Sequence, residues 1–374
     1  MHKNAHLFDA KPGTAASAPV DWWVINDAAS GGVVDLLHGK RLHQPEKVKV
    51  FIDHDTPCGS VEVALKQRTM IRFAEENGCE LFNGYGISHQ IMLDRFARSG
   101  DVVAGCFTFP AMYGATGAFG VSVTPETLAQ SLQSGEISFT VPHTVAIKLE
   151  GAFTVPSSAK DAALFLRAQP KYGTRDARVV FTGEGAAAMP LAERTALCQM
   201  LNASVAVFDP LYAGTVDHVL DFSSLVPMIA GPDNTDVLAP ASSFSGEAVN
   251  EVFLGGCSGG RIEDLRVAAS ILAGKRVPPR VRLMVAPATS EVYRQAADEG
   301  LLATFLDAGA ILMNQGCSVC WGKSQGIVDD GEVLLSAGSY NHKGCAGTEN
   351  SRVYLCSPAI AAHSALAGTI RGGS

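Results

Sequence analysis

The sequence predicts an α/β protein with mainly parallel sheets that helices cover on both faces. Short apolar, β-branched runs alternate with helical patterns almost throughout, as in "KVKVFIDH" (47–54) followed by "VEVALKQRTMIRFAEENG" (61–78). Such alternation is typical of parallel sheets. Hydrophobic residues make up 47% of the 374 residues and charged residues only 18%. A chain of this length and composition is expected to form two or three packed domains.

Local signals support each element in turn. The helix at 61–78 is expected to end at Gly78, because glycine readily adopts the left-handed conformation of a C-cap. The helix at 124–135 opens with a threonine cap and has Glu126 in its first turn. The other predicted elements are strands at 101–107, 143–153 (edge-like), 251–256 and 280–289, and helices at 158–169, 261–274 and 290–309.

The predicted organisation is a flexible arm, two α/β lobes of different size and a third lobe. Residues 209–246 are rich in Pro, Gly, Asp and Ser and predict a linker. The predicted boundaries are 1–20 for the arm, 21–175 for the first lobe, 176–245 for the second lobe with the linker, and 246–374 for the third lobe.

Composition excludes several classes of protein. The formal net charge of −8 argues against a nucleic-acid partner. The sequence has no run of 18 or more apolar residues and therefore predicts no membrane span. The polar start of the chain lacks the apolar core of a signal peptide. Nine scattered cysteines, an odd number, fit reduced thiols in a cytoplasmic protein better than a disulfide framework.

Three cysteines stand in glycine-flanked loops. Cys257 lies between a predicted strand and a predicted helix, whose N-terminus favours negative charge, and Cys317 and Cys320 form a C-x-x-C pair after another strand. A redox dithiol would normally begin a helix, and structural zinc would need a fourth ligand such as His342 or Cys345. Three thiolates without an obvious fourth favour an iron–sulfur cluster with one open iron, which acts as a Lewis acid.

At these residues the chain resembles the aconitase family, especially the large subunits of isopropylmalate and homoaconitate dehydratases. The resemblance spans nearly the whole chain and rests on motifs in the family order: "FIDH", "GISHQI", "MYGATGAFG", "FTGEGAAAMPLAERTALCQM", "GGCSGGRIEDLRVAA", "GCSVCWG" and "SYN" followed by "YLCSPAIAAHSALAGTI". It implies three α/β/α lobes around a central [4Fe-4S] cluster. It also implies a swivelling fourth domain, which in the dehydratases is a separate small subunit.

The resemblance implies roles for particular residues near the cluster. Cys257, Cys317 and Cys320 match the cluster ligands, with a smaller cluster or another metal as the alternative, and Asn341 matches an asparagine beside the cluster. In the family a serine of the small subunit removes the proton α to a carboxylate.

Further positions match family residues that act on the substrate. Asp53 and His54 match a pair that assists protonation and loss of the substrate hydroxyl, and His89 matches a histidine beside that pair. Asn26 and Asp27 fall where the family has residues near the substrate. The alternatives are that Asp53 caps the next element and that His89 is a hydrogen-bonded core histidine.

The chain also departs from the family. Phe107, Thr108 and Phe109 replace an Asp–Ser–His triplet, and the two aromatic residues either belong to the core or line a more apolar pocket. Gly259 replaces an asparagine, and Ala203 replaces a glutamate.

The positive charge of the pocket changes as well. His342 and Cys345 stand where the family has arginines that bind carboxylates, and Lys343 or Arg261 is the candidate substitute, although Arg261 also fits a structural role at a helix start. Ser258 is expected to line the same pocket.

Two further thiols lie near the predicted site. Cys58 and Cys106 are candidates for a fourth ligand or a reactive group, with silent packing as the alternative.

The sequence therefore predicts a cytoplasmic, heteromeric, cluster-dependent hydro-lyase, a dehydratase or isomerase. Its small-molecule substrate is expected to be a hydroxy acid with fewer carboxylates than citrate or isopropylmalate, or with an amide, phosphonate or amino group. The alternatives are different lyase, carbon–sulfur or carbon–nitrogen chemistry at the same cluster, and a non-catalytic binding scaffold.

Overall fold

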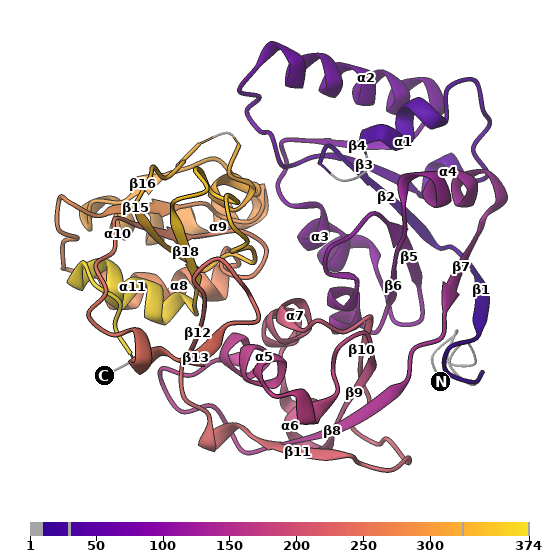
Figure 1. Ribbon diagram of the computed structural model, residues 1–374. Coiled ribbons are helices and arrows are strands. Elements are labelled where there is room, and N and C mark those ends of the chain that lie inside the picture. Colours follow the sequence, from indigo (N-terminus) through magenta and orange to yellow (C-terminus); the bar gives the residue numbers. More distant parts are fainter. Residues whose placement is uncertain (1–9, 29–30, 324, 373–374) are drawn as a thin grey trace.

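The computed structural model describes residues 10–28, 31–323 and 325–372, which form three α/β lobes. Figure 1 shows the first lobe, in indigo and purple, beside the third lobe, in orange and yellow, with the magenta second lobe below both. Among the described helices, none has the length and apolar character that crossing a bilayer requires.

The first lobe is built on a parallel sheet with strand order β4-β3-β2-β5-β6. Every residue of β3 is buried, as expected for a strand that helices cover on both faces. Its strands are β2 Trp22–Asn26, β3 Val48–Ile52, β4 Glu80–Asn83, β5 Val102–Gly105 and β6 Phe119–Ser122, and its helices are α1 Gly31–Leu36, α2 Val61–Asn77, α3 Ser88–Ile91 and α4 Pro125–Ser134.

The predicted caps of this lobe are confirmed. Gly78 ends α2 in the left-handed conformation, and the Thr124 side chain accepts a hydrogen bond from the N–H of Thr127 at the start of α4.

The second lobe has a parallel sheet with strand order β10-β9-β8-β11. The prediction that 143–153 forms an edge strand is wrong, because β11 pairs with the outer side of β8 and places it inside the sheet. The strands are β8 Thr144–Glu150, β9 Arg178–Thr182, β10 Val205–Phe208 and β11 His218–Asp221, and the helices are α5 Ala159–Ala168, α6 Gly183–Ala188 and α7 Leu191–Met200.

The third lobe has a mixed sheet with strand order β13-β12-β18-β17-β14-β15-β16. The stretch 209–246 is not a linker, because it supplies β11 to the second sheet and the antiparallel strands β12 and β13 to the third. The strands are β12 Met228–Ala230, β13 Leu238–Pro240, β14 Glu251–Leu254, β15 Arg282–Val285, β16 Ile311–Leu312, β17 Val333–Ser336 and β18 Arg352–Leu355, and the helices are α8 Ile262–Leu272, α9 Ser290–Asp298, α10 Leu301–Asp307 and α11 Pro358–Ala367.

The part of the predicted arm that the structure describes is partly ordered into a strand. β1 (Ala15–Pro19) pairs antiparallel with β7 (Glu136–Thr140), whereas residues 1–9 lie outside the described residues. The exact domain boundaries remain a prediction, although β8 and α5 lie in the stretch assigned to the first lobe and belong to the second sheet and its cover.

Several short helices connect these elements. They are η2 Pro45–Lys47, the π-helical turn η3 Met92–Phe96, η4 Pro110–Thr116, η5 Pro170–Tyr172, η6 Phe222–Ser224, η7 Ala241–Phe244 and η8 Ser318–Trp321.

Candidate active site between the first and third lobes

The candidate site lies where loops after three parallel strands meet. Asp53 directly follows β3 of the first lobe, and Cys257 and Asn341 follow β14 and β17 of the third lobe. The Cys317 loop joins the two lobes, because the N–H of Cys317 donates to the carbonyl of Asp53 at 3.1 Å. Ligand sites typically form outside the carboxyl ends of such strands.

A glycine permits this close approach. Gly316 has φ of +135°, and a Cβ atom there would lie 2.8 Å from the Asp53 carbonyl oxygen. A side chain at this position would therefore push the C-x-x-C loop away from Asp53.

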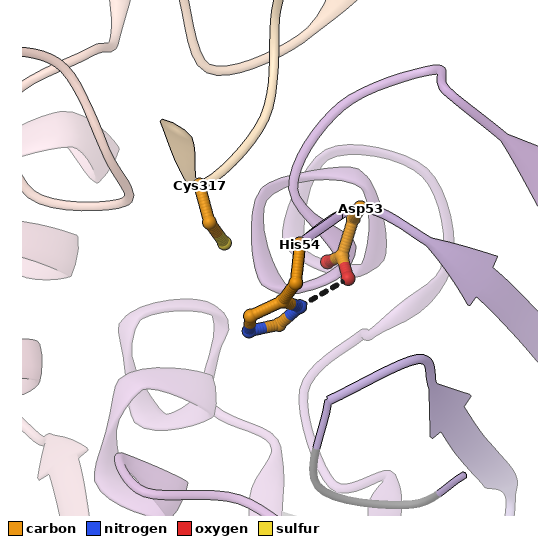
Figure 2. Close-up of side chains that lie close together, drawn as sticks. All are labelled: Asp53, His54 and Cys317. Carbon is orange, nitrogen blue, oxygen red and sulfur yellow. Dashed lines mark hydrogen bonds and ion pairs between the residues drawn. The ribbon is translucent and has the colours of Figure 1, made fainter. Parts of the chain in front are cut away.

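Asp53 and His54 form a close pair beside Cys317, as Figure 2 shows. His54 Nδ1 lies 2.6 Å from Asp53 Oδ1, and since a carboxylate only accepts, Nδ1 is the donor. Nε2 therefore remains as the imidazole nitrogen turned away from Asp53. The other Asp53 oxygen accepts from the N–H of Ser88 at 2.7 Å.

The surroundings favour the charged forms of this pair. Burial acts to raise the pKa of Asp53, but the charge and hydrogen bond of His54 and the bonds from Ser88 hold that pKa well below its usual range. Burial acts to lower the pKa of His54, but the charges of Cys317 and Asp53 and hydrogen bonds to Asp27 and Asp53 raise it well above its ordinary value.

Asp27 anchors the loop that carries this pair. Its carboxylate accepts from the backbone N–H groups of Asp53, His54 and Asp55 at 3.3, 3.1 and 3.2 Å, and its side chain is fully buried. Asn26, the last residue of β2, is also buried. Asp27 therefore acts on the loop directly and fixes the position of His54.

His89 lies close to the pair in an aromatic environment. Its ring packs edge-on against Phe107, with centroids 5.3 Å apart, and Nδ1 lies 3.4 Å from the Tyr113 hydroxyl. Burial lowers the pKa of His89 to about 4, with Asp53 opposing and His54 reinforcing the shift. At neutral pH His89 is therefore uncharged.

The three cysteines of the two glycine-flanked loops converge around Cys257. Cys257 and Cys317 pack in one small apolar cluster. Ser339 links Cys257 to Cys320, because its hydroxyl lies 3.4 Å from Cys257 Sγ and its N–H donates to Cys320 Sγ at 3.5 Å. The Gln199 amide also donates to Cys257 Sγ.

The pKa values of the three thiols differ from those of a reactive dithiol. Burial raises the pKa of Cys257 to about 11 and that of Cys317 to about 12, and it also raises the pKa of Cys320. Catalytic dithiols have lowered pKa values. Buried thiols of this kind become thiolates when a bound metal compensates their charge, which is the condition for soft metal ligation.

A single metal ion would find a different set of ligands. Asp53, His54 and Cys317 place one ligand atom each within 4.8 Å of one another. A multi-iron cluster interposes iron and sulfide between its thiolates, so its ligands need not lie that close together.

Gly259, one of the departures from the family pattern, lies where the Cys257 loop touches the turn after β17. A Cβ atom there would lie 2.4 Å from the Ala337 carbonyl oxygen. The loop after β14 thus packs directly on the turn after β17, with no room for an asparagine side chain in this arrangement.

A cavity of about 500 Å³ lies next to the cysteine loops, although none of the three cysteines lines it. Ser339 contacts Cys257 and Cys320 and also lines this cavity. The full lining comprises residues 107–110, 122, 167, 176, 201–204, 235 and 339–342.

The Phe–Thr–Phe triplet forms one wall of this cavity. Phe107 packs on Tyr113, Phe109 packs on Tyr340 with centroids 5.3 Å apart, and the Tyr340 hydroxyl donates to Thr108. The two aromatic residues therefore line a pocket, and Phe107 also belongs to the first-lobe core.

The cavity offers little uncommitted positive charge. Arg167 lines it, but its guanidinium is paired with Asp236 at 2.7 Å. His342 lines it too, with its ring edge-on to Tyr340, and Lys343 is exposed.

Two other predicted site residues have different surroundings. The Asn341 amide donates to Ala230, and its buried carbonyl oxygen has no hydrogen-bond partner. Ser258 bonds to the carbonyls of Ala337 and Gly338 and lines a separate cavity of about 260 Å³ on the side of α5 and α8.

The other three cysteines considered for the site, Cys345, Cys106 and Cys58, differ in burial and location. Cys345 is buried near Cys320, and its carbonyl abuts Gly322. Cys106 packs in the first-lobe core, and Cys58 is exposed.

Some motif residues shape the site through contacts between lobes that sequence patterns do not indicate. Trp321 Nε1 donates to Asp55 at 2.8 Å and its ring lies edge-on to His54, which ties the two lobes together. Gln90 donates to the Cys257 carbonyl at 2.5 Å and accepts from Arg261. Arg261, at the start of α8, also pairs with Asp94 in η3. Trp321, Gln90 and Arg261 all lie within the quoted motifs, and the structural role expected for Arg261 at a helix start fits these contacts.

Comparisons with known proteins agree with this architecture. The family model described as "Aconitase family (aconitate hydratase)" matches residues 4–210 and 233–368. The chain is 33% identical to 3-isopropylmalate dehydratase large subunit 2 of Archaeoglobus fulgidus, over 97% of this chain and 94% of that protein. It is 35% identical to the homoaconitase large subunit of Thermus thermophilus, over 90% and 89%. The crystal structure of holo aconitase X from Thermococcus kodakaraensis has the same general fold, with a TM-score of 0.56 at 11% identity, over 86% of this chain and 84% of that one.

Proposed function

The chain belongs to the aconitase family, and on that premise we propose that it is an iron–sulfur-dependent hydro-lyase, a dehydratase or isomerase, for a small hydroxy acid other than citrate or isopropylmalate. The family resemblance inferred from the motifs is thereby confirmed. The substrate, the cluster type and the roles of individual residues belong to the proposal.

The donor set fits an iron–sulfur cluster. Cys257, Cys317 and Cys320 converge, and their thiols are shielded enough that burial raises each pKa. These three residues would hold a [4Fe-4S] cluster, which when bound supplies a Lewis acid at an iron without a protein ligand. Asn341 lines the neighbouring cavity, and its buried amide oxygen has no hydrogen-bond partner.

The protein's own residues would donate the proton with which the substrate hydroxyl leaves as water. Asp53 binds Nδ1 of His54 and leaves Nε2 as the nitrogen that donates a proton. Asp27 keeps their loop in place, and the uncharged His89 contributes a hydrogen bond or relays the proton.

The observation that carries the substrate assignment is the wall of the cavity beside the cysteines. Phe107 and Phe109 occupy the wall where ionisable residues would hold a polycarboxylate, and Arg167 is already paired with Asp236. A carboxylate binds most tightly to a free guanidinium fork, so each missing fork disfavours an additional carboxylate on the substrate.

We further propose a separate small subunit as the partner and a cytoplasmic location. Both relatives named above are called large subunits, and this chain spans most of their length. The location rests on the cysteine composition, which suits a reducing compartment.

The test is anaerobic purification, loading with iron and sulfide, and assay together with a candidate small subunit. A panel of hydroxy acids with one, two and three carboxylates would be followed by product NMR. The highest kcat/KM is expected for an acid with fewer carboxylates than either citrate or 3-isopropylmalate. A preference for citrate or 3-isopropylmalate would refute the substrate assignment, and a colourless, iron-free protein would refute the cluster.

A further inference from the structure

A lysine of the second lobe is buried beneath the sulfur site. Lys160 lies in the first turn of α5 and is only 2% exposed. Its ammonium donates to the carbonyls of Ala337 at 2.5 Å and Gly338 at 2.8 Å and to the Ser258 hydroxyl at 3.2 Å. All three donors of an ammonium group are thereby used.

These acceptors belong to the two loops that hold the sulfurs in place. Ser258 is adjacent to Cys257, and the next residue after Gly338 is Ser339, whose N–H donates to Cys320 Sγ. The Ser258 hydroxyl itself bonds to the same two carbonyls. One side chain from the second lobe therefore joins two loops of the third lobe.

A buried positive charge requires compensation. Burial lowers the pKa of Lys160, and the nearby Cys356, Asp264, Cys320 and Asp161 oppose that shift when they are ionised. Carbonyl dipoles stabilise the ammonium only in part, and an isolated charge in such an environment is costly. Thiolates that bind a metal cluster would provide negative charge on the side where the two loops meet.

We propose that Lys160 is a positioning residue for the sulfur site: its ammonium holds the Cys257 loop and the 337–339 turn together, and its charge stabilises a reduced cluster. The second role rests on the proposed function, because it needs the cluster. The first role does not, since the hydrogen bonds involve only the protein.

Two substitutions separate these roles. Lys160→Met removes both the hydrogen bonds and the charge, whereas Lys160→Gln removes the charge and keeps an amide donor. Lys148→Met is the matched control, because Lys148 lies in the same lobe but is half-exposed and paired with Glu150. Hydrogen exchange of the cluster-free chain and the midpoint potential of the cluster-loaded chain would be measured for each variant.

In Lys160→Met, amides of 255–260 and 336–340 are expected to exchange at least tenfold faster, with α8 and α11 unchanged. The midpoint potential is expected to fall in both Lys160 variants by about 59 mV, which corresponds to a tenfold loss of preference for the reduced state in a one-electron couple. Lys148→Met is expected to change neither quantity.

Unchanged exchange at the two loops, or equally faster exchange throughout the chain, would overturn the positioning role. An unchanged potential in both variants would overturn the charge role. If the unmodified chain takes up no cluster, the proposed function fails, the charge role fails with it, and hydrogen exchange still decides whether Lys160 holds the loops.

Discussion

Replacing Gly259 by alanine should push the Cys257 loop away from the 337–339 turn, whose Ser339 N–H contacts Cys320 Sγ. The added Cβ would lie 2.4 Å from the Ala337 oxygen and 2.6 Å from the Ala337 Cβ, whereas ordinary contact begins at 3.4 Å. The loops must therefore move apart by roughly 1 Å, and overpacking of this kind costs about 1–3 kcal/mol. At about 2.1 cal/mol/K of unfolding entropy per residue, a chain of 374 residues loses about 1.3 °C per kcal/mol, so Tm should fall by about 1–4 °C.

The assay is thermal unfolding of the cluster-free chain, followed by iron and sulfide analysis after reconstitution. Gly259→Ala is expected to lower both Tm and iron content, because the displacement moves Cys257 relative to Cys320. Gly32→Ala is the control, since a Cβ there meets nothing within 4 Å and alanine suits the helix α1. A Gly259→Ala chain that melts and binds iron like the unmodified protein would refute the proposed packing of these loops.

Further predictions concern the pair, the pocket and the pH dependence of stability. Asp27→Ala orphans the N–H groups of residues 53–55 and should lower kcat about 100-fold with iron content retained; activity near normal would contradict the anchoring role. Asp236→Asn should free Arg167 and lower KM for dicarboxylates several-fold relative to monocarboxylates, which steady-state kinetics would reveal or disprove. Burial raises the pKa of Asp161 to about 6, against hydrogen bonds from Ser158 and Met228 and the charge of Lys160. The folded chain thus holds this proton more tightly than the unfolded chain. The free energy of unfolding should therefore fall by up to about 3 kcal/mol as the pH rises from about 4 to about 6, at about 1.4 kcal/mol per pH unit. Urea titrations at several pH values should show that the free energy of unfolding falls less steeply with pH in Asp161→Asn than in the unmodified chain. Equal pH dependence in the two proteins would contradict the prediction.

Much of the fold follows from short-range patterns in the sequence. The α2 helix ends at Gly78, and α4 begins at its threonine cap, because these ends depend on neighbouring backbone groups alone. The family motifs also predicted that the three cysteines and the Asp53–His54 pair meet.

Features that depend on distant partners were not predictable in this way. The position of β8 inside its sheet depends on β11, which lies in a stretch whose composition is typical of a loop. The anchoring role of Asp27 and the direction of Ser258 toward Lys160 depend on loops far apart in the sequence. Periodicity carries no information about such contacts.

The site divides into two parts that reside on different segments. Asp53, His54 and Cys317 are joined through the backbone of two loops and through Trp321, whereas the cavity wall at 107–109 and His342 takes no part in those bonds. Substitutions at Phe109 or His342 can therefore change the cavity without directly disturbing Asp53, His54 and Cys317, whereas Phe107 also packs against His89. Such an arrangement allows evolution to keep the Asp53, His54 and Cys317 cluster while the residues of the cavity wall change.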